Sequence, residues 1–148
     1  MKAPGRLFCF GLGYTAARLA ARVAAEGWSV AGTCRDVEHR QRLMREGYEM
    51  SLFNRDMPLD VGILAGATHV LSSIPPDERG DPVIDLLGHD ICRPDALEWV
   101  GYLSTTGVYG DTGGDWVNEK STCNPTNLRS RRRLAVEQAW QALHETCG

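Results

Sequence analysis

The sequence predicts an α/β fold, in which a parallel sheet carries helices on both faces, and three observations support this. A short apolar run at 7–10 leads at once into a Gly-x-Gly turn at 11–13. Apolar residues then recur at helical spacing over 16–24, and Gly27 can close that helix. Apolar runs and helical segments go on alternating along the chain, which is typical of parallel strands joined by crossover helices.

The first half of the chain contains three expected strands and the helices that follow them. Each strand is a short apolar run bounded by glycine or by polar residues. Asp36 stands where the second helix begins, and an aspartate there can accept a hydrogen bond from a free backbone N–H. The expected strands are 7–10, 28–34 and 48–53, and the expected helices are 16–24, 37–46 and a short one at 59–64.

The second half continues the alternation with two more strands. The first of these is stopped by two consecutive prolines, Pro75 and Pro76. The order of elements predicts a doubly wound parallel sheet of the Rossmann type, in three α/β/α layers and without a substantial substrate domain. The expected elements are strands at 69–74 and 97–104, a short helix at 83–87, and a long helix after Pro125 that carries Val136, Trp140, Leu143 and Cys147 at helical spacing.

Length and composition narrow the class of protein. The 148 residues fit one domain, 1–148, and the net charge of −3 gives no reason to expect a nucleic-acid partner. No apolar run approaches the ~20 residues that a membrane span needs, and the first residues do not form a signal peptide. The five cysteines form no Cys-x-x-Cys and the four histidines lack metal-ligand spacing. We therefore expect reduced thiols, a cytoplasmic protein and no metal site.

The opening strand, turn and helix predict a dinucleotide-binding site. Gly11 allows the tight turn, and Gly13 lets the backbone approach a pyrophosphate at the helix N-terminus. Ala16 takes the third place of the motif, where a small residue lets helix and strand pack closely. Tyr14 and Thr15 open the helix and are expected at the cofactor. The motif alone is a weak signal, since an ordinary turn between strand and helix has the same pattern.

The ends of two later strands are expected to complete this site. Arg35 follows the second strand, where an arginine can pair with the 2′-phosphate of NADP. Asp36 could instead accept from the ribose of NAD, but it is then lost as a helix cap, so NADP is favoured and NAD stays an alternative. The turn at Ser73, Ile74 and Pro75 follows the fourth strand and should line the cofactor crevice.

The segment from Leu103 to Asp111, with its Thr105-Thr106-Gly107-Val108-Tyr109-Gly110 core, resembles the extended short-chain dehydrogenase/reductase superfamily. The likeness is to the sugar-nucleotide epimerase/dehydratase branch, and in particular to atypical NAD(P)-binding members with a Ser-Ile-Pro-Pro turn. It covers essentially the whole chain, and the Gly-Thr-x-Arg at 32–35 belongs to it. The resemblance implies a small-molecule substrate of unknown identity and a nicotinamide dinucleotide as cofactor.

The resemblance also implies catalytic residues, and here the chain departs from the family pattern. In the family a Ser or Thr orients the substrate, a tyrosine exchanges the proton, and a lysine holds the nicotinamide ribose. Thr105 falls on the Ser/Thr position, whereas Arg129 and Arg133 fall on the tyrosine and lysine positions. Arg133 could keep the cofactor-binding role, but Arg129 has no acceptor atom and cannot exchange a proton. Tyr109 is the candidate replacement phenol.

Two functions follow as alternatives. One is an NAD(P)-dependent oxidoreductase or epimerase acting on a small or sugar-nucleotide substrate. The other is a dinucleotide-binding sensor or scaffold without catalysis. The chain ends where the family's substrate domain would follow, so it is expected to be a truncated product or a cofactor-binding half. The apolar stripe of the last helix could form a homodimer or could cover the sheet. The arginine run 129–133 is either a site for a phosphate-rich ligand or a solvated helix start.

Overall fold

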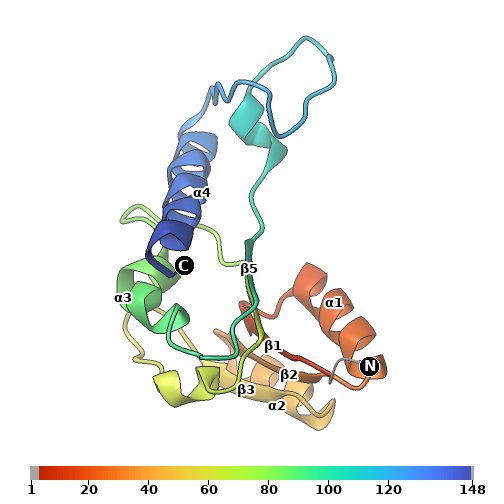
Figure 1. The fold of residues 1–148 in the computed structure, drawn as a ribbon. Coiled ribbons are helices and arrows are strands. Elements are labelled where there is room, and N and C mark those ends of the chain that lie inside the picture. The colour runs from red at the N-terminus through yellow and green to blue at the C-terminus, as the bar shows by residue number, and fades with distance from the viewer. Residues whose placement is uncertain (1–3, 148) are drawn as a thin grey trace.

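The computed structural model describes residues 4–147, apart from the side chains of residues 144 and 147. It contains one five-stranded sheet in which every pairing is parallel and the strand order is β3-β2-β1-β4-β5. The order reverses at β1, so the predicted doubly wound Rossmann-like sheet is confirmed (Figure 1). The strands are β1 (Arg6–Phe10), β2 (Ser29–Cys34), β3 (Glu49–Leu52), β4 (His69–Ser72) and β5 (Trp99–Tyr102).

Four α-helices and two 3₁₀ helices connect the strands. The segment expected as a short helix at 59–64 forms the 3₁₀ helix η1, and a second one, η2, follows β5. The helix expected at 83–87 is longer than predicted and continues past Gly88. Asp81 caps its start, and the buried side chains Val83, Leu87 and Ile91, at helical spacing, hold one side of it against the core. The helices are α1 (Tyr14–Ala25), α2 (Val37–Arg45), η1 (Val61–Leu64), α3 (Pro82–Ile91), η2 (Thr106–Tyr109) and α4 (Leu128–Cys147).

The alternation of side chains along β1 divides the core between the two faces of the sheet. Leu7 and Cys9 belong to one buried cluster, which contains Ala16 and Ala20 of α1 and residues of α2. Phe8 and Phe10 belong to a second cluster, which contains residues of η1, α3 and α4. Helices therefore cover both faces of the sheet, as the sequence predicts.

Helix α4 packs against the sheet through the apolar stripe that the sequence singles out. Val136 and Trp140 are buried in the second cluster, and Leu143 packs against it. Trp140 Nε1 also donates a 2.8 Å hydrogen bond to Asp81 Oδ2, which joins α4 to the start of α3. Of the two alternatives for this stripe, covering the sheet is the one that the structure shows.

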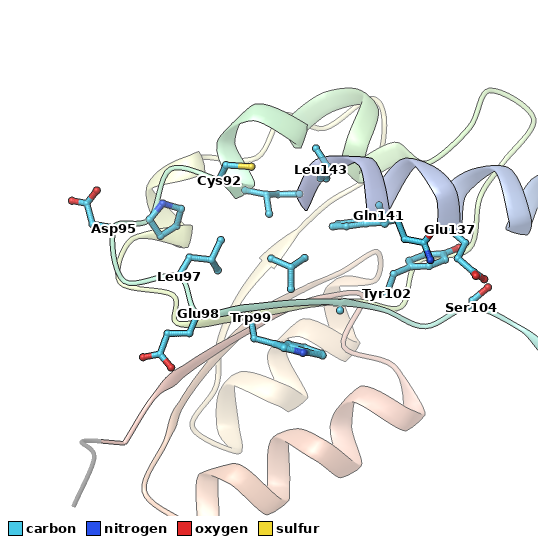
Figure 2. Close-up of a pocket in the computed structure, with 15 residues that line it drawn as sticks. Cys92, Asp95, Leu97, Glu98, Trp99, Tyr102, Ser104, Glu137, Gln141 and Leu143 are labelled. Carbon is cyan, nitrogen blue, oxygen red and sulfur yellow. The ribbon is translucent and has the colours of Figure 1, made fainter. Parts of the chain in front are cut away.

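The strand β5 forms an edge of the sheet and borders an open groove of about 870 Å³. In Figure 2, Tyr102 and Glu137 lie at one end of this groove, and Leu97 and Cys92 lie at the other. The Trp99 side chain is 46% exposed. Its ring lies over Gly101 and occupies the space that a side chain at position 101 would need, since an added Cβ there would collide with the ring.

The cysteines only partly follow the expectation of reduced thiols. Cys9 and Cys34 are free and buried, and Cys123 is free and exposed. Cys92 is disulfide-bonded, so the expectation is wrong at this residue. Disulfide formation depends on two Cα atoms approaching within about 7 Å in the fold, which the spacing of cysteines in a sequence does not reveal. The side chain of Cys147 lies outside those described.

Two further features concern metal sites and helices that could span a membrane. Among the side chains that the structure describes, which leave out those of residues 144 and 147, no group of histidine, cysteine or acidic residues could hold a metal ion. None of the described helices combines the length and the apolar character needed to cross a bilayer.

Candidate dinucleotide cleft

A cleft of about 750 Å³ lies at the carboxyl edge of the sheet. It is bounded by the glycine turn after β1, the ends of β2 and β3, and the turn after β4. This is the place where the strand order reverses, and ligands of doubly wound sheets bind at such points. The cleft therefore lies where the motifs of the sequence point.

The glycine turn is shaped for a close approach of ligand to backbone. Gly11 has a φ of +79°, a conformation that favours glycine, and its N–H donates to Thr33 Oγ1 at 2.9 Å. Gly13 precedes α1 without a side-chain cap, and a Cβ added there would meet nothing within 4 Å. Gly13 thus leaves open space beside the N-terminus of α1, where free backbone amides and the helix dipole favour an anion.

The turn after β4 is fastened to the glycine turn. Ser73 Oγ donates to the Gly11 carbonyl, and a Cβ on Gly11 would lie 2.9 Å from Ile74 Cγ1. Ser73, Ile74 and Pro75 all line the cleft. The structure therefore brings this turn together with Gly11, Gly13 and Arg35, as the sequence suggests.

Arg35 and Asp36 have different surroundings at the end of β2. Asp36 Oδ1 accepts a 2.7 Å hydrogen bond from His39 N, so this carboxylate is occupied as the cap of α2. The exposed Arg35 lines the cleft, and no ion pair involving it is found among the described residues. The guanidinium is thus available to a ligand, whereas the neighbouring carboxylate is engaged.

An arginine bridges the far end of the cleft, and its ion pairs were not expected from the sequence. Arg55 follows β3, and its Nη2 lies 2.9 Å from Asp77 Oδ1 and 2.7 Å from Asp85 Oδ2. Hydrogen bonds from Arg55 lower the pKa of Asp77 from 3.8 to about 2, and the same partners raise the pKa of Arg55. Because Arg55 and Asp77 are 22 residues apart, only the fold shows that they meet.

Thr33 was also missed, although it is nearly fully buried in β2 and holds the glycine turn. Its backbone carbonyl accepts a 2.8 Å hydrogen bond from Leu12 N, in addition to the bond that its hydroxyl accepts from Gly11. A buried threonine at the end of an apolar strand is the signal that could have found it, since a buried hydroxyl needs a partner.

Five predicted site residues, Arg133 among them, do not line the cleft. Tyr14 is 80% exposed and lies beside Arg18, whose Cζ is 5.4 Å from the ring centre, and Thr15 is exposed on α1. Thr105 is exposed and caps η2, its Oγ1 accepting from Gly107 N at 3.2 Å. Tyr109 is half-buried at the end of η2. Their predicted contacts with cofactor and substrate stay predictions.

Arg133 lies apart from the main cleft, at the end of β5. Its Nη1 donates to the Tyr102 hydroxyl at 3.1 Å and to the Leu103 carbonyl at 2.9 Å. Burial raises the pKa of Tyr102 despite the nearby guanidinium, so this phenol keeps its proton at neutral pH. Arg133 lines a separate small pocket with Arg129, and this pocket shares Pro75 and Pro76 with the main cleft.

The comparisons with known proteins agree with this geometry. No family model matches the sequence, and no curated protein matches it significantly. A solved structure of a conserved protein of unknown function from Silicibacter pomeroyi is 44% identical, with a TM-score of 0.83 over 94% of this chain and 48% of its own. A protein from Methylobacillus flagellatus, provisionally assigned as an NAD-dependent epimerase/dehydratase, is 20% identical, with a TM-score of 0.76 over 95% of this chain and 51% of its own.

A third similar structure is UDP-glucuronic acid 4-epimerase from Bacillus cereus, solved in complex with NAD. It is 15% identical, with a TM-score of 0.72 over 95% of this chain and 52% of its own. The chain thus has the Rossmann-like fold of solved structures described as epimerase/dehydratase, epimerase and reductase, and the predicted resemblance is confirmed at the level of the fold. It spans about half the length of the solved structures that it matches.

Proposed function

We propose that the chain binds a nicotinamide dinucleotide, with the pyrophosphate at the glycine turn. The observation that carries this proposal is the open space beside Gly13, at the uncapped N-terminus of α1, where an anion is favoured. A cleft of about 750 Å³ extends from this turn toward the ends of β2 and β3, on the side where Arg35 lies. The adenosine half of the cofactor fits on that side, and the nicotinamide half then lies toward β4 and α4.

Arg35 favours NADP over NAD in this proposal. Its guanidinium is exposed in the cleft and can pair with a 2′-phosphate. The competing acceptor, Asp36, is engaged by His39 N at 2.7 Å. If Asp36 turned to the ribose of NAD and gave up its bond to His39 N, the lost cap would cost about 1 kcal/mol of helix stability.

A charge placed at Gly13 tests the dinucleotide proposal directly. Gly13 has a φ of −88° and room for a side chain, so Gly13→Asp should fold while its carboxylate occupies the place of the pyrophosphate. We expect affinity for NADPH and NADH, followed by nicotinamide fluorescence, to fall more than about tenfold, which is ~1.4 kcal/mol. Thr122→Asp adds the same charge at an exposed position outside the cleft and serves as the control. Unchanged binding in Gly13→Asp would remove the site from the glycine turn.

A substitution of Arg35 tests the preference for NADP over NAD. Arg35→Ala should weaken NADPH binding by about tenfold and leave NADH binding within about twofold, because only NADPH carries the 2′-phosphate. Equal losses for the two dinucleotides would argue against a contact between Arg35 and that phosphate.

The chemical activity divides into two candidates. In the first, the protein is an oxidoreductase or epimerase on a small or sugar-nucleotide substrate, with Thr105 and Tyr109 as catalytic groups and Arg133 at the cofactor. In the second, it is a dinucleotide-binding sensor or scaffold, and the arginines at 129 and 133 favour this reading, since neither can exchange a proton. A hydride-transfer screen against sugar nucleotides and small ketones separates the two. Turnover that stays at the wild-type level in both Thr105→Ala and Tyr109→Phe would exclude these residues from the reaction.

The proposal also includes a homodimer and a cytoplasmic location. A homodimer through α4 would have to use the exposed side of the helix, because Val136 and Trp140 are buried against the sheet. A solution mass equal to one chain would exclude it. The free thiols of Cys9 and Cys34 fit a cytoplasmic protein, whereas the disulfide at Cys92 does not favour that location.

A further inference from the structure

We propose that a small pocket beside the dinucleotide cleft binds the acidic group, a carboxylate or a phosphate, of a small organic molecule. The pocket has a volume of about 300 Å³, at the lower end of the range for small-molecule sites. Its walls come from the turn after β4 and from the first turns of α4. The lining residues are Pro75, Pro76, Leu128, Arg129, Arg132 and Arg133.

Arg133 is the residue that points to an anion. Its side chain is only 9% exposed, and its Nε has no hydrogen-bond partner although the atom is buried. Nη1 bonds to two neutral oxygens, the Tyr102 hydroxyl and the Leu103 carbonyl, and no carboxylate pairs with this residue within the part of the chain that the structure describes. A buried cation without a counter-charge is costly, and a bound oxyanion would supply that charge.

The two neighbouring arginines add to this imbalance. Arg129 and Arg132 line the same pocket, and neither forms an ion pair among the described side chains. Arg129 lies in the first turn of α4, where the helix dipole disfavours positive charge, and Arg132 and Arg133 follow in the next turn. An anion bound between the three guanidinium groups reduces their mutual repulsion and offsets the unfavourable interaction with the helix dipole. Arg131, by contrast, is exposed and does not line the pocket.

The opposite wall indicates what the rest of the ligand is like. Pro75 and Pro76 offer no backbone N–H, and the Leu128 side chain is 58% exposed beside them. An acid with an apolar stem would therefore bind better than a bare inorganic ion. Pro75 and Pro76 line the dinucleotide cleft as well, so such a molecule reaches toward the cofactor. A role of this molecule as the substrate rests on the proposed function, whereas its binding in the pocket does not.

Calorimetric titration with two probes tests the pocket. Phenyl phosphate should bind the wild-type chain about fivefold or more tightly than inorganic phosphate, because the apolar wall is desolvated with it. Benzoate and acetate form the same comparison for a carboxylate. Arg129→Ala/Arg132→Ala should weaken phenyl phosphate by about tenfold or more at constant ionic strength, whereas Arg131→Ala should stay within about twofold. Equal losses in the two variants, or no preference for the phenyl compounds, would overturn the proposal.

Two further measurements keep the outcomes distinct. Arg132→Gln removes one charge at a half-exposed position and should reproduce part of the loss with an unchanged unfolding midpoint, which separates ligand contact from folding. Saturation with NADH blocks the glycine turn, so a titration with phenyl phosphate under these conditions reports binding outside that turn. Phenyl phosphate binding that persists in Gly13→Asp, while both dinucleotides fail to bind the wild-type chain, would refute the proposed cofactor but leave this pocket intact.

Discussion

At the scale of single residues, the bridge from Arg55 to Asp77 makes the cleft sensitive to acid. Arg55 is largely buried, with a side-chain exposure of 11%, whereas Asp77 is 41% exposed. Asp77 also accepts from Arg79 N at 2.8 Å, so its ionised form is held by more than one donor. These donors lower the pKa of Asp77 to about 2 in the folded chain, below its ordinary value of 3.8.

We expect Asp77→Asn to change how stability depends on pH. Because the folded pKa is lowered, the ionised Asp77 stabilises the fold above about pH 4, and this contribution is lost as the pH falls toward 2. The difference in unfolding midpoint between wild type and variant should therefore be largest at pH 5 and vanish toward pH 2, as urea unfolding at a series of pH values would show. A difference that stays constant over this window would contradict the assignment.

Individual residues were predictable where their role is local. Asp36 was recognised as a cap because its partner, His39 N, lies three residues away on the same chain segment. Thr33 and Arg55 were not recognised, because each acts on a residue 22 positions away that only the assembled sheet brings near. The open side of Gly13 was inferred from the motif alone, since a glycine at that place is needed only if something approaches its backbone.

At the scale of elements, the contact between α3 and α4 depends on one buried carboxylate. Asp81 is 2% exposed, and its Oδ1 accepts from Val83 N at 2.7 Å and from Ile84 N at 3.1 Å. Its other oxygen accepts from Trp140 Nε1, and the Trp140 ring stacks on Tyr102 with ring centres 5.9 Å apart. Asp81 thus caps one helix and anchors the other.

Trp140→Phe should destabilise the chain by about 1–3 kcal/mol, because Asp81 Oδ2 loses its donor while it stays buried. Phenylalanine is smaller than the buried indole, so the cavity that it leaves adds to the loss of the hydrogen bond. Chemical denaturation measures the loss. Trp116→Phe, at a fully exposed tryptophan, should remain within about 0.5 kcal/mol of the wild type. Equal effects of the two substitutions would mean that the bond to Asp81 contributes nothing.

The elements themselves followed from hydrophobic periodicity, but their lengths followed from contacts. Strands β1 to β5 lie within the apolar runs to within a few residues. Helix α3 exceeded its expected length because its cap, Asp81, and its buried side chains Val83, Leu87 and Ile91 outweigh the weak helix propensity of Gly88. Propensity is local, whereas burial depends on which surface a helix meets.

At the scale of the whole molecule, β5 leaves one edge of the sheet open. The groove along it is bordered by α4 on one side, and the half-exposed Trp99 lies across Gly101. Edge strands with exposed apolar side chains promote association between chains. The sequence predicted the five strands and the doubly wound class, but it did not indicate that Trp99 on the edge strand would be 46% exposed.

We therefore expect concentration-dependent association through this edge. Trp99→Lys should reduce light scattering of concentrated samples, because a lysine on an edge strand opposes pairing with another chain. Trp116→Lys adds the same charge at a fully exposed tryptophan outside the sheet, and it should leave association unchanged. Scattering that falls equally in both variants would point to net charge rather than to β5.

The central place of β1 has a consequence for how the protein is made. One edge of β1 pairs with β2, but its other edge pairs with β4, in the register Leu7 with His69. A ribosome therefore releases the first strand long before its second neighbour exists. Until β4 has been synthesised, β1 remains an apolar strand with an unpaired edge in the nascent chain. We expect a chaperone to bind the nascent chain at this strand.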